Sequence, residues 1–167
     1  MIETTYKKLT TSISSNGAYY RYKAILMWKN IPKVRSYDSL AIGHYASVTQ
    51  KGNLYFTQEH CTSTTNCTSS STFTPQKFSK GASATFKIPT GNIISLKQTL
   101  YFDVKKNVDA TIIRQIACGD YSHATKTISA TNSLNLTVND SGINLNSSIS
   151  NYYDEISPAC ATWDGSW

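Results

Sequence analysis

Three histidines are the side chains of this sequence that titrate near neutral pH, and each lies close to a carboxylic acid. The neighbouring pairs are Asp38 and His44, Glu59 and His60, and Asp120 and His123. Hydrolysis by a side-chain nucleophile requires a nucleophile, a base and an orienting group within hydrogen-bonding reach of one another. A hydrolase that uses His123 with Asp120 or Asp103 is therefore one functional hypothesis.

The sequence does not mark a nucleophile for such chemistry. Ser122-His123 lies close to Cys118, but the surrounding pattern predicts a buried strand, and a disulfide would remove the thiolate. Asp154-Glu155 is the one adjacent acid pair, whereas glycoside hydrolysis needs two carboxylates that face each other across a cleft. We therefore expect a protein that is not an enzyme and has no catalytic residues.

Motifs for cofactors and metals are missing from the sequence as well. It has no glycine-rich phosphate loop, no HExxH helix and no EF-hand loop. Cys61 and Cys67 lack the short spacing and the neighbouring histidine pair of a zinc site. The sequence thus predicts no cofactor and no bound metal.

Four cysteines allow three disulfide pairings: Cys61, Cys67, Cys118 and Cys160. The most economical pairing joins Cys61 to Cys67 around a short Ser/Thr loop, and joins the other two to each other. The second bond would close the longer loop and would restrict the unfolded chain more. Buried free thiols in a reducing compartment are the alternative.

Exposed aromatic side chains are the positive indication of ligand recognition. Tyr and Trp combine an apolar ring with a polar tip, so they stack on sugars and lie at membrane interfaces. On a strand, one ring of two adjacent tyrosines must face outward. The candidate ligand contacts are Tyr19, Tyr152, Tyr153, Trp163 and Trp167. Core filling is the better interpretation for Tyr20, Tyr22 and Trp28.

Positive charge is concentrated in the first third of the chain. The formal net charge of +6 arises wholly within residues 1–51, because residues 52–167 carry equal numbers of basic and acidic side chains. A basic patch attracts an anionic membrane or wall polymer, although a solvated strand face is the simpler interpretation. The candidate contacts are Arg21, Lys23, Lys29, Lys33 and Arg35. Since these residues are not gathered on one helix, we expect no nucleic-acid partner.

The amino-acid composition indicates that β-strands position these side chains. Ser and Thr together make up 43 of the 167 residues, and Tyr and Asn are also abundant. Thr and Tyr suit pleated, half-exposed surfaces, whereas Ser and Asn suit turns. The sequence predicts an all-β fold, a single-domain antiparallel β-sandwich of the jelly-roll or Greek-key type, with nine or ten strands and little or no helix.

Residues 94–121 carry the clearest strand pattern. Apolar and polar residues alternate from Ile94 to Lys105 with the period of a strand. Asn107-Val108-Asp109 predicts a tight turn, and the return strand to Tyr121 is apolar on both faces for part of its length. The resulting β-hairpin has the length that crosses a bilayer, which motivates a membrane-binding or pore-forming alternative.

Further segments complete the expected architecture. Residues 1–17 form a polar N-terminal segment that ends in a turn, and residues 59–80 form a Ser/Thr-rich surface loop. Gly52-Asn53 predicts a turn. Residues 134–138 and 143–145 alternate in the same way and predict a second hairpin.

All 167 residues fit one domain with one core. The sequence has no apolar run long enough for a transmembrane helix, and no secretory signal follows Met1. Disulfides nevertheless favour a secreted or cell-surface protein whose signal peptide is not part of this sequence. Abundant Asn, Lys, Ile, Ser, Thr and Tyr suggest an AT-rich, bacterial genome.

Our leading hypothesis is a secreted or cell-surface, non-enzymatic binding module. It would present the loop of residues 59–80 and the exposed aromatic residues to a glycan, a wall polymer or a protein partner. The membrane-active protein that uses residues 94–121 is the first alternative, and the hydrolase that uses His123 is the second.

Overall fold

The structure is a computed structural model that describes residues 1–129 and 136–167. These described residues form fourteen strands and one short 3₁₀ helix. The strands are β1 (Ile2–Glu3), β2 (Lys7–Asn16), β3 (Tyr19–Trp28), β4 (Tyr37–His44), β5 (Val48–Cys61), β6 (Cys67–Ser70), β7 (Gln76–Phe78), β8 (Gly81–Lys87), β9 (Ser95–Lys106), β10 (Arg114–Ala124), β11 (Leu136–Asn139), β12 (Gly142–Leu145), β13 (Tyr153–Glu155) and β14 (Ala159–Asp164), and the helix is η1 (Ser150–Tyr152).

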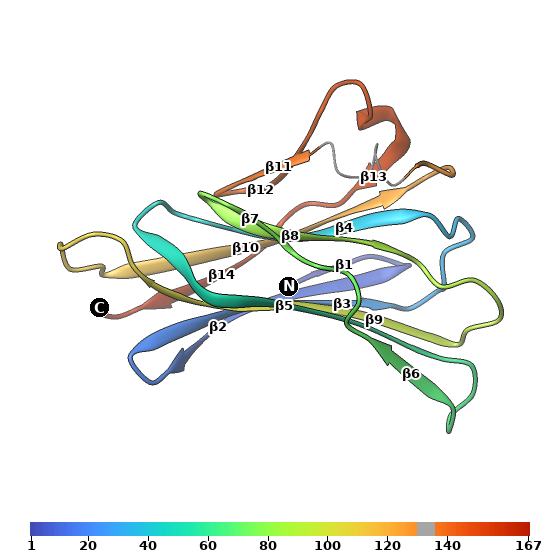
Figure 1. Ribbon diagram of the computed structural model, residues 1–167, viewed down its shortest axis with the longest axis horizontal. Coiled ribbons are helices and arrows are strands. Elements are labelled where there is room, and N and C mark those ends of the chain that lie inside the picture. Colours follow the sequence, from blue (N-terminus) through green and yellow to red (C-terminus); the bar gives the residue numbers. More distant parts are fainter. Residues whose placement is uncertain (130–135) are drawn as a thin grey trace.

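Two antiparallel sheets pack face to face, and a separate hairpin lies beside one of them (Figure 1). Sheet A has the strand order β1-β2-β3-β9-β5-β6, and sheet B has the order β13-β10-β4-β8-β7, with β14 also paired to β10. The predicted all-β antiparallel sandwich is therefore confirmed. Its strand count is higher than the nine or ten expected, because edge strands such as β1 and β7 are only 2 and 3 residues long. Strands this short show no alternation in a sequence.

The core lies between the sheets and takes the apolar parity of the long strands. In β9, Leu100 and Phe102 are fully buried while Tyr101 between them is only partly buried. Tyr22 and Trp28 on β3 are buried, as predicted, whereas Tyr20 is only partly buried and packs against the core. Besides His44, the other large side chains that are fully buried are Tyr121, Phe86, Leu9, Leu26, Leu40, Ile42, Ile88 and Leu96. Each such side chain contributes roughly 1.5–3 kcal/mol of hydrophobic free energy on burial.

The long hairpin expected over residues 94–121 is not formed. β9 lies in sheet A between β3 and β5, whereas β10 lies in sheet B next to β4. Residues 107–113 therefore cross from one sheet to the other instead of making a tight turn (Figure 1). Every half-buried strand of a sandwich alternates, so alternation cannot identify the partner of a strand. The prediction of a hairpin here is wrong, and of the features that motivated the membrane-active alternative only the basic first third of the chain remains.

The strands β4 and β10 are buried on both faces because a further hairpin covers the outer face of sheet B. The hairpin of β11 and β12 covers the outer face of sheet B (Figure 1), where Leu136 and Val138 pack against Ala41. This second hairpin was predicted; residues 134 and 135 of its expected first strand lie outside the described residues. The contact is close, because a Cβ atom at Gly43 of β4 would overlap the backbone oxygen of Asn139.

Residues 1–17 are more regular than a polar N-terminal segment. They contain β1 and β2, and β2 pairs with β3 along its whole length. The buried positions of β2 include Lys7 and Thr11 besides Leu9, so polar residues hide the alternation.

The turn expected at Gly52-Asn53 is also wrong, because β5 continues through these residues with an irregular register between Lys51 and Tyr55. A β-bulge accommodates the extra residues without ending the strand.

Candidate functional site

The outer face of sheet A carries a pair of stacked tyrosines. The rings of Tyr55 on β5 and Tyr101 on β9 have centroids 4.9 Å apart and planes inclined by 16°. The two residues are direct partners in the β5–β9 register, so strand pairing itself places the rings side by side. Tyr55 is 45% exposed. The pair therefore offers a flat aromatic surface to a ligand.

Cationic side chains surround this pair. The Arg21 guanidinium lies 4.8 Å, and Nζ of Lys23 5.7 Å, from the centre of the Tyr101 ring. Lys51 on β5 lies over Tyr19 on β3, with Nζ 3.7 Å from the ring centre. Such contacts hold ammonium and guanidinium groups against aromatic rings. We call this surface the tyrosine face; it consists of Tyr19, Arg21, Lys23, Lys51, Tyr55 and Tyr101.

A shallow groove of about 410 Å³ adjoins the tyrosine face. Residues 54–57 of β5 and Tyr101 form one side, and Phe73, Thr74 and Pro75 lie on the other. The Phe73 ring packs edge-on against Phe56, with centroids 6.4 Å apart, which ties this connecting segment to β5. An extended chain that follows the groove would meet aromatic rings and hydroxyl groups together.

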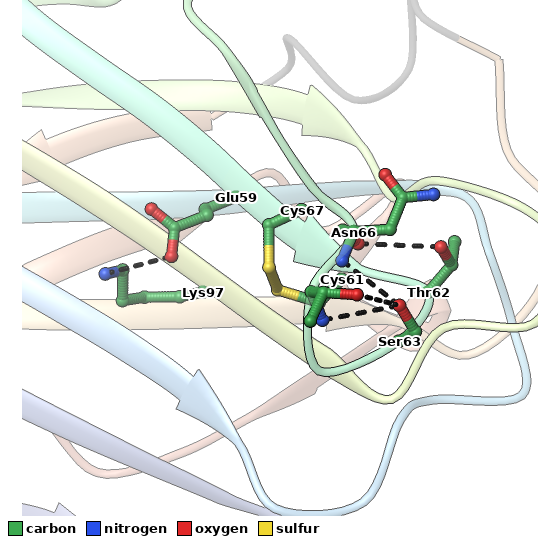
Figure 2. The surroundings of a disulfide bond; sticks show 8 residues. Glu59, Cys61, Thr62, Ser63, Asn66, Cys67 and Lys97 are labelled. Atoms are coloured by element: carbon green, nitrogen blue, oxygen red, sulfur yellow. Dashed lines mark hydrogen bonds and ion pairs between the residues drawn. A yellow bond between two sulfur atoms is a disulfide. The ribbon is translucent and has the colours of Figure 1, made fainter.

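The first half of the Ser/Thr-rich segment of residues 59–80 forms the edge of sheet A, and β7 near its end forms an edge of sheet B. β6 pairs with the end of β5, and a disulfide joins the directly opposed Cys61 and Cys67 (Figure 2). Oγ of Ser63 accepts a hydrogen bond from the backbone N–H of Asn66 at 3.1 Å and closes the turn. None of residues 61–80 is buried, but the segment is an edge hairpin followed by β7 rather than a loop, because backbone pairing satisfies its polar groups.

A larger pocket, of about 950 Å³, opens at one end of the sandwich. We call it the end pocket. Residues from β1, β2, β3, β10 and β13 and from the segment after β3 line it: Ile2, Thr4, Tyr6, Lys7, Trp28, Asn30, Ile31, Pro32, Lys33, His123, Asp154, Glu155, Ile156 and Ser157. Its walls are thus mainly apolar, with charged groups of both signs among them.

A buried carboxylate holds the histidine of the end pocket. Oδ2 of Asp38 lies 2.8 Å from Nδ1 of His123 and also accepts the hydroxyl of Tyr121, while Oδ1 accepts the backbone N–H of Ala124 at 2.8 Å. Burial raises the pKa of Asp38, and the hydrogen bonds from His123 and Tyr121 oppose that rise. The Asp38 carboxyl therefore satisfies three donors in the interior.

Lys7 is a buried cation in the same pocket, only 4% exposed. Its Nζ lies 3.7 Å from Oδ2 of Asp154, 5.1 Å from the centre of the Trp28 ring and 5.0 Å from that of the Tyr121 ring. Burial lowers the pKa of Lys7, while the charges of Asp154 and Asp38 raise it. Acidic and aromatic partners together are what a buried ammonium requires.

This cluster does not assemble the predicted hydrolase. His123 pairs with Asp38 and not with Asp120 or Asp103, which bind backbone amides and an arginine instead. Oγ of Ser122 is buried without a hydrogen-bond partner in the described residues, so it does not contact the imidazole. Within residues 1–129 and 136–167 there is also no cluster of three or more potential metal ligands. The Asp38–His123 pair is a hydrogen-bonded contact between β4 and β10.

No protein-family model and no curated protein matches this sequence. Solved structures do share its fold. The collagen-binding domain from a Staphylococcus aureus adhesin has a TM-score of 0.50 and 7% identity, with 98% of this chain and 100% of that chain covered. ACE19, the collagen binding subdomain of the Enterococcus faecalis surface protein ACE, has a TM-score of 0.48 and 9% identity, with 97% of both chains covered.

A third structure is the collagen binding domain of the Erysipelothrix rhusiopathiae surface protein RspB, with a TM-score of 0.46 and 11% identity. The match covers 96% of this chain and 48% of that one, so this chain spans about half the length of the Erysipelothrix chain. At such identities the likeness concerns the fold alone, and the Staphylococcus aureus domain supports the two-sheet sandwich described above.

The predicted ligand-contact aromatics do not form one surface. Tyr19 lies on the tyrosine face. Trp163 and Trp167 pack against Tyr20, with ring centroids 5.4 and 4.8 Å away, and the backbone of Trp167 exchanges two hydrogen bonds with Ile112. The C-terminal indole is therefore held in place.

The adjacent pair Tyr152 and Tyr153 lies elsewhere. Tyr153 is buried in a small cluster with Ala124 and Ile128, and Nζ of Lys126 lies 3.9 Å from the centre of the Tyr152 ring. Contact of these two residues with a ligand stays a prediction.

The five predicted basic contacts are likewise dispersed. Arg21 and Lys23 lie on the tyrosine face. Lys29 forms an ion pair with Glu3 at 2.8 Å, and Lys33 lines the end pocket. Arg35 donates to the backbone oxygens of Pro32 and Pro89.

Sequence reasoning missed Tyr55, Tyr101 and Lys51. Tyr101 stands on the polar parity of an alternating strand, a signal that predicts an outward ring. Its stacking partner depends on the register between β5 and β9, which the sequence does not state.

Proposed function

We propose that this protein is a non-enzymatic binding module of a bacterial cell surface, and that its 167 residues act as one domain. Its partner is an extended polypeptide that lies across the tyrosine face and follows the adjoining groove. The stacked pair of Tyr55 and Tyr101 carries this proposal, because aromatic rings that gather partly exposed on one sheet face are typical of an interaction site.

Collagen is the partner to test first. The structural neighbour from Staphylococcus aureus is described as collagen-binding, and collagen strands are extended and rich in proline. Aromatic-lined grooves are common docking sites for proline-rich chains. Lys23 and Lys51, which have no ion-pair partner in the described part of the chain, would meet carboxylates or backbone oxygens of the partner.

The experiment is surface plasmon resonance on immobilised fibrillar collagen and on a triple-helical peptide. Tyr55→Ala and Tyr101→Ala are each expected to weaken binding at least about tenfold, which corresponds to roughly 1.4 kcal/mol. Tyr45→Ala is the matched control, because Tyr45 has the same 45% exposure as Tyr55 and directly follows β4 of sheet B. Absence of binding by the unmodified protein would exclude collagen, and equal losses in all three variants would exclude the tyrosine face.

A further inference from the structure

The end pocket contains a buried donor that the protein leaves unused. Nε1 of Trp28 is buried and has no hydrogen-bond partner within residues 1–129 and 136–167. Among the buried side-chain atoms of this described part that lack a partner, it is the one whose residue lines the end pocket. Trp28 thus places an indole at the wall of the end pocket, and its shielded N–H makes it a reporter of changes in that wall.

Acceptors around the pocket are also available. Asn30 donates its amide N–H to the backbone oxygen of Thr5 at 3.0 Å, and its own amide oxygen makes no hydrogen bond within the described residues. In the same part of the chain the Glu155 carboxylate forms no ion pair or hydrogen bond, although it lines the pocket. The lining of the pocket therefore offers both donors and acceptors, which suits hydroxyl groups, because a hydroxyl both donates and accepts.

The charged side chains that line the end pocket indicate whether its ligand is anionic, cationic or neutral. Lys7 and Lys33 line the pocket, and so do Asp154 and Glu155, so the fixed charges sum to zero. An anion would meet the two carboxylates and a cation would meet the two ammonium groups, since unlike charges must be matched at a desolvated site. The pocket therefore favours a neutral ligand.

Aromatic surface completes the site. Tyr6 at the pocket is 63% exposed, the same fraction as Met1 and well above other tyrosines of this chain, and Trp28 provides a second ring. Apolar ring faces next to hydrogen-bonding groups match the two-sided character of a sugar. The volume of about 950 Å³ lies at the upper end of the range of ligand pockets, about 300–1,000 Å³, and accommodates a short saccharide.

We propose that the end pocket binds a neutral di- or trisaccharide, which stacks on Tyr6, pairs its hydroxyls with Asn30 and Glu155, and lies against Trp28. This site is independent of the proposed polypeptide site, because the two share no residue. Loss of one activity would leave the other intact.

Indole N–H signals in ¹H–¹⁵N correlation spectra test the proposal, because the chain has only three tryptophans. The probes are cellobiose, lactose, mannobiose and chitobiose, with sialyllactose as the anionic and glucosamine disaccharide as the cationic comparator. We expect at least one neutral probe to shift the Trp28 signal saturably and to leave Trp163 and Trp167 unmoved. The charged comparators are expected to bind about tenfold more weakly.

Variants separate this site from unspecific binding. Tyr6→Ala removes an exposed ring, so the fold is retained, and it is expected to weaken the best neutral probe about tenfold. Glu155→Gln keeps an acceptor but removes a charge, so it should strengthen sialyllactose while neutral binding changes little. Tyr45→Ala is the control. The proposal is overturned if no neutral probe moves the Trp28 signal, if charged and neutral probes bind equally, or if Tyr6→Ala binds like the unmodified protein.

Discussion

Oδ2 of Asp38 lies 2.8 Å from Nδ1 of His123, although 85 residues separate them in the sequence. The contact follows from the pairing of β4 with β10 in sheet B, which aligns Ser39 with Ser122. Proximity in sequence suggested other partners for both residues. Asp38 is instead an interior acceptor that holds Tyr121, His123 and the backbone of β10 in place.

Asp38→Ala is expected to lower the free energy of unfolding by about 3 kcal/mol. The substitution would leave the Tyr121 hydroxyl and the Ala124 N–H buried without their acceptor, and such groups cost about 1–3 kcal/mol each. Urea unfolding followed by tryptophan fluorescence measures the change. Glu59→Ala is the control, because its ion pair with Lys97 is partly exposed and should contribute less than about 1 kcal/mol. Equal effects of both substitutions would contradict the structural role of Asp38.

Asp120 should make stability fall as the pH rises through mildly acidic values. Burial raises the pKa of Asp120 from an ordinary 3.8 to about 6, against hydrogen bonds from the backbone of Ile143 and Tyr121. The folded protein holds this proton more tightly than the unfolded chain. Protonation of Asp120 therefore stabilises the folded state fully below pH 3.8. This contribution to the free energy of unfolding, about 3 kcal/mol in total, is lost as the pH rises past 6.

The test compares urea unfolding of Asp120→Asn and of the unmodified protein between about pH 4 and about pH 6. Asn has one carbonyl oxygen, so the variant is less stable throughout, and the readout is the slope with pH. We expect a flatter slope than in the unmodified protein. Ser122→Ala, on the same strand, removes a hydroxyl that does not titrate and should keep the original slope. An unchanged slope in Asp120→Asn would contradict the raised pKa.

The two disulfides should differ in their contribution to stability. Cys118–Cys160 joins β10 to β14 across a sequence separation of 42 residues, whereas Cys61–Cys67 spans 6. Loop-closure entropy assigns about 4 kcal/mol to the first and about 2 kcal/mol to the second. Double Cys→Ser variants, compared by urea unfolding, measure both values. A larger loss for the Cys61–Cys67 variant would show that contacts in the edge hairpin outweigh chain entropy.

Vesicles should stay intact in the presence of this protein. Both edges of β9 are paired, with β3 and β5, and both edges of β10 are paired, with β4 on one side and β13 and β14 on the other. Insertion of residues 94–121 would break both sheets. Dye-release assays on neutral and anionic vesicles, with detergent as the positive control, are expected to show no release. Release would restore the membrane-active hypothesis.

Within the residues that the structure describes, no helix has the length and apolar character needed to cross a membrane.

Local pattern accounts for what the sequence predicted well. The alternation from Ile94 to Lys105 predicted β9 and its inward face, because a strand places alternate side chains on opposite sides. The second hairpin was equally visible, since its turn residues lie between two alternating runs. The all-β class, the presence of disulfides and the core role of Tyr22 and Trp28 were thus available from residue types and their spacing.

The pairing of strands that are distant in the sequence determined which residues come together at the candidate sites. The register of β5 with β9 stacks Tyr55 on Tyr101, and the register of β4 with β10 brings Asp38 to His123. Packing of β2 and β13 at one end of the sandwich places Lys7 beside Asp154. An alternating pattern is satisfied by many partners and by either sheet, because it records only which side of a strand is buried. The choice among those partners depends on the packing of the whole core, which no local stretch of this sequence contains.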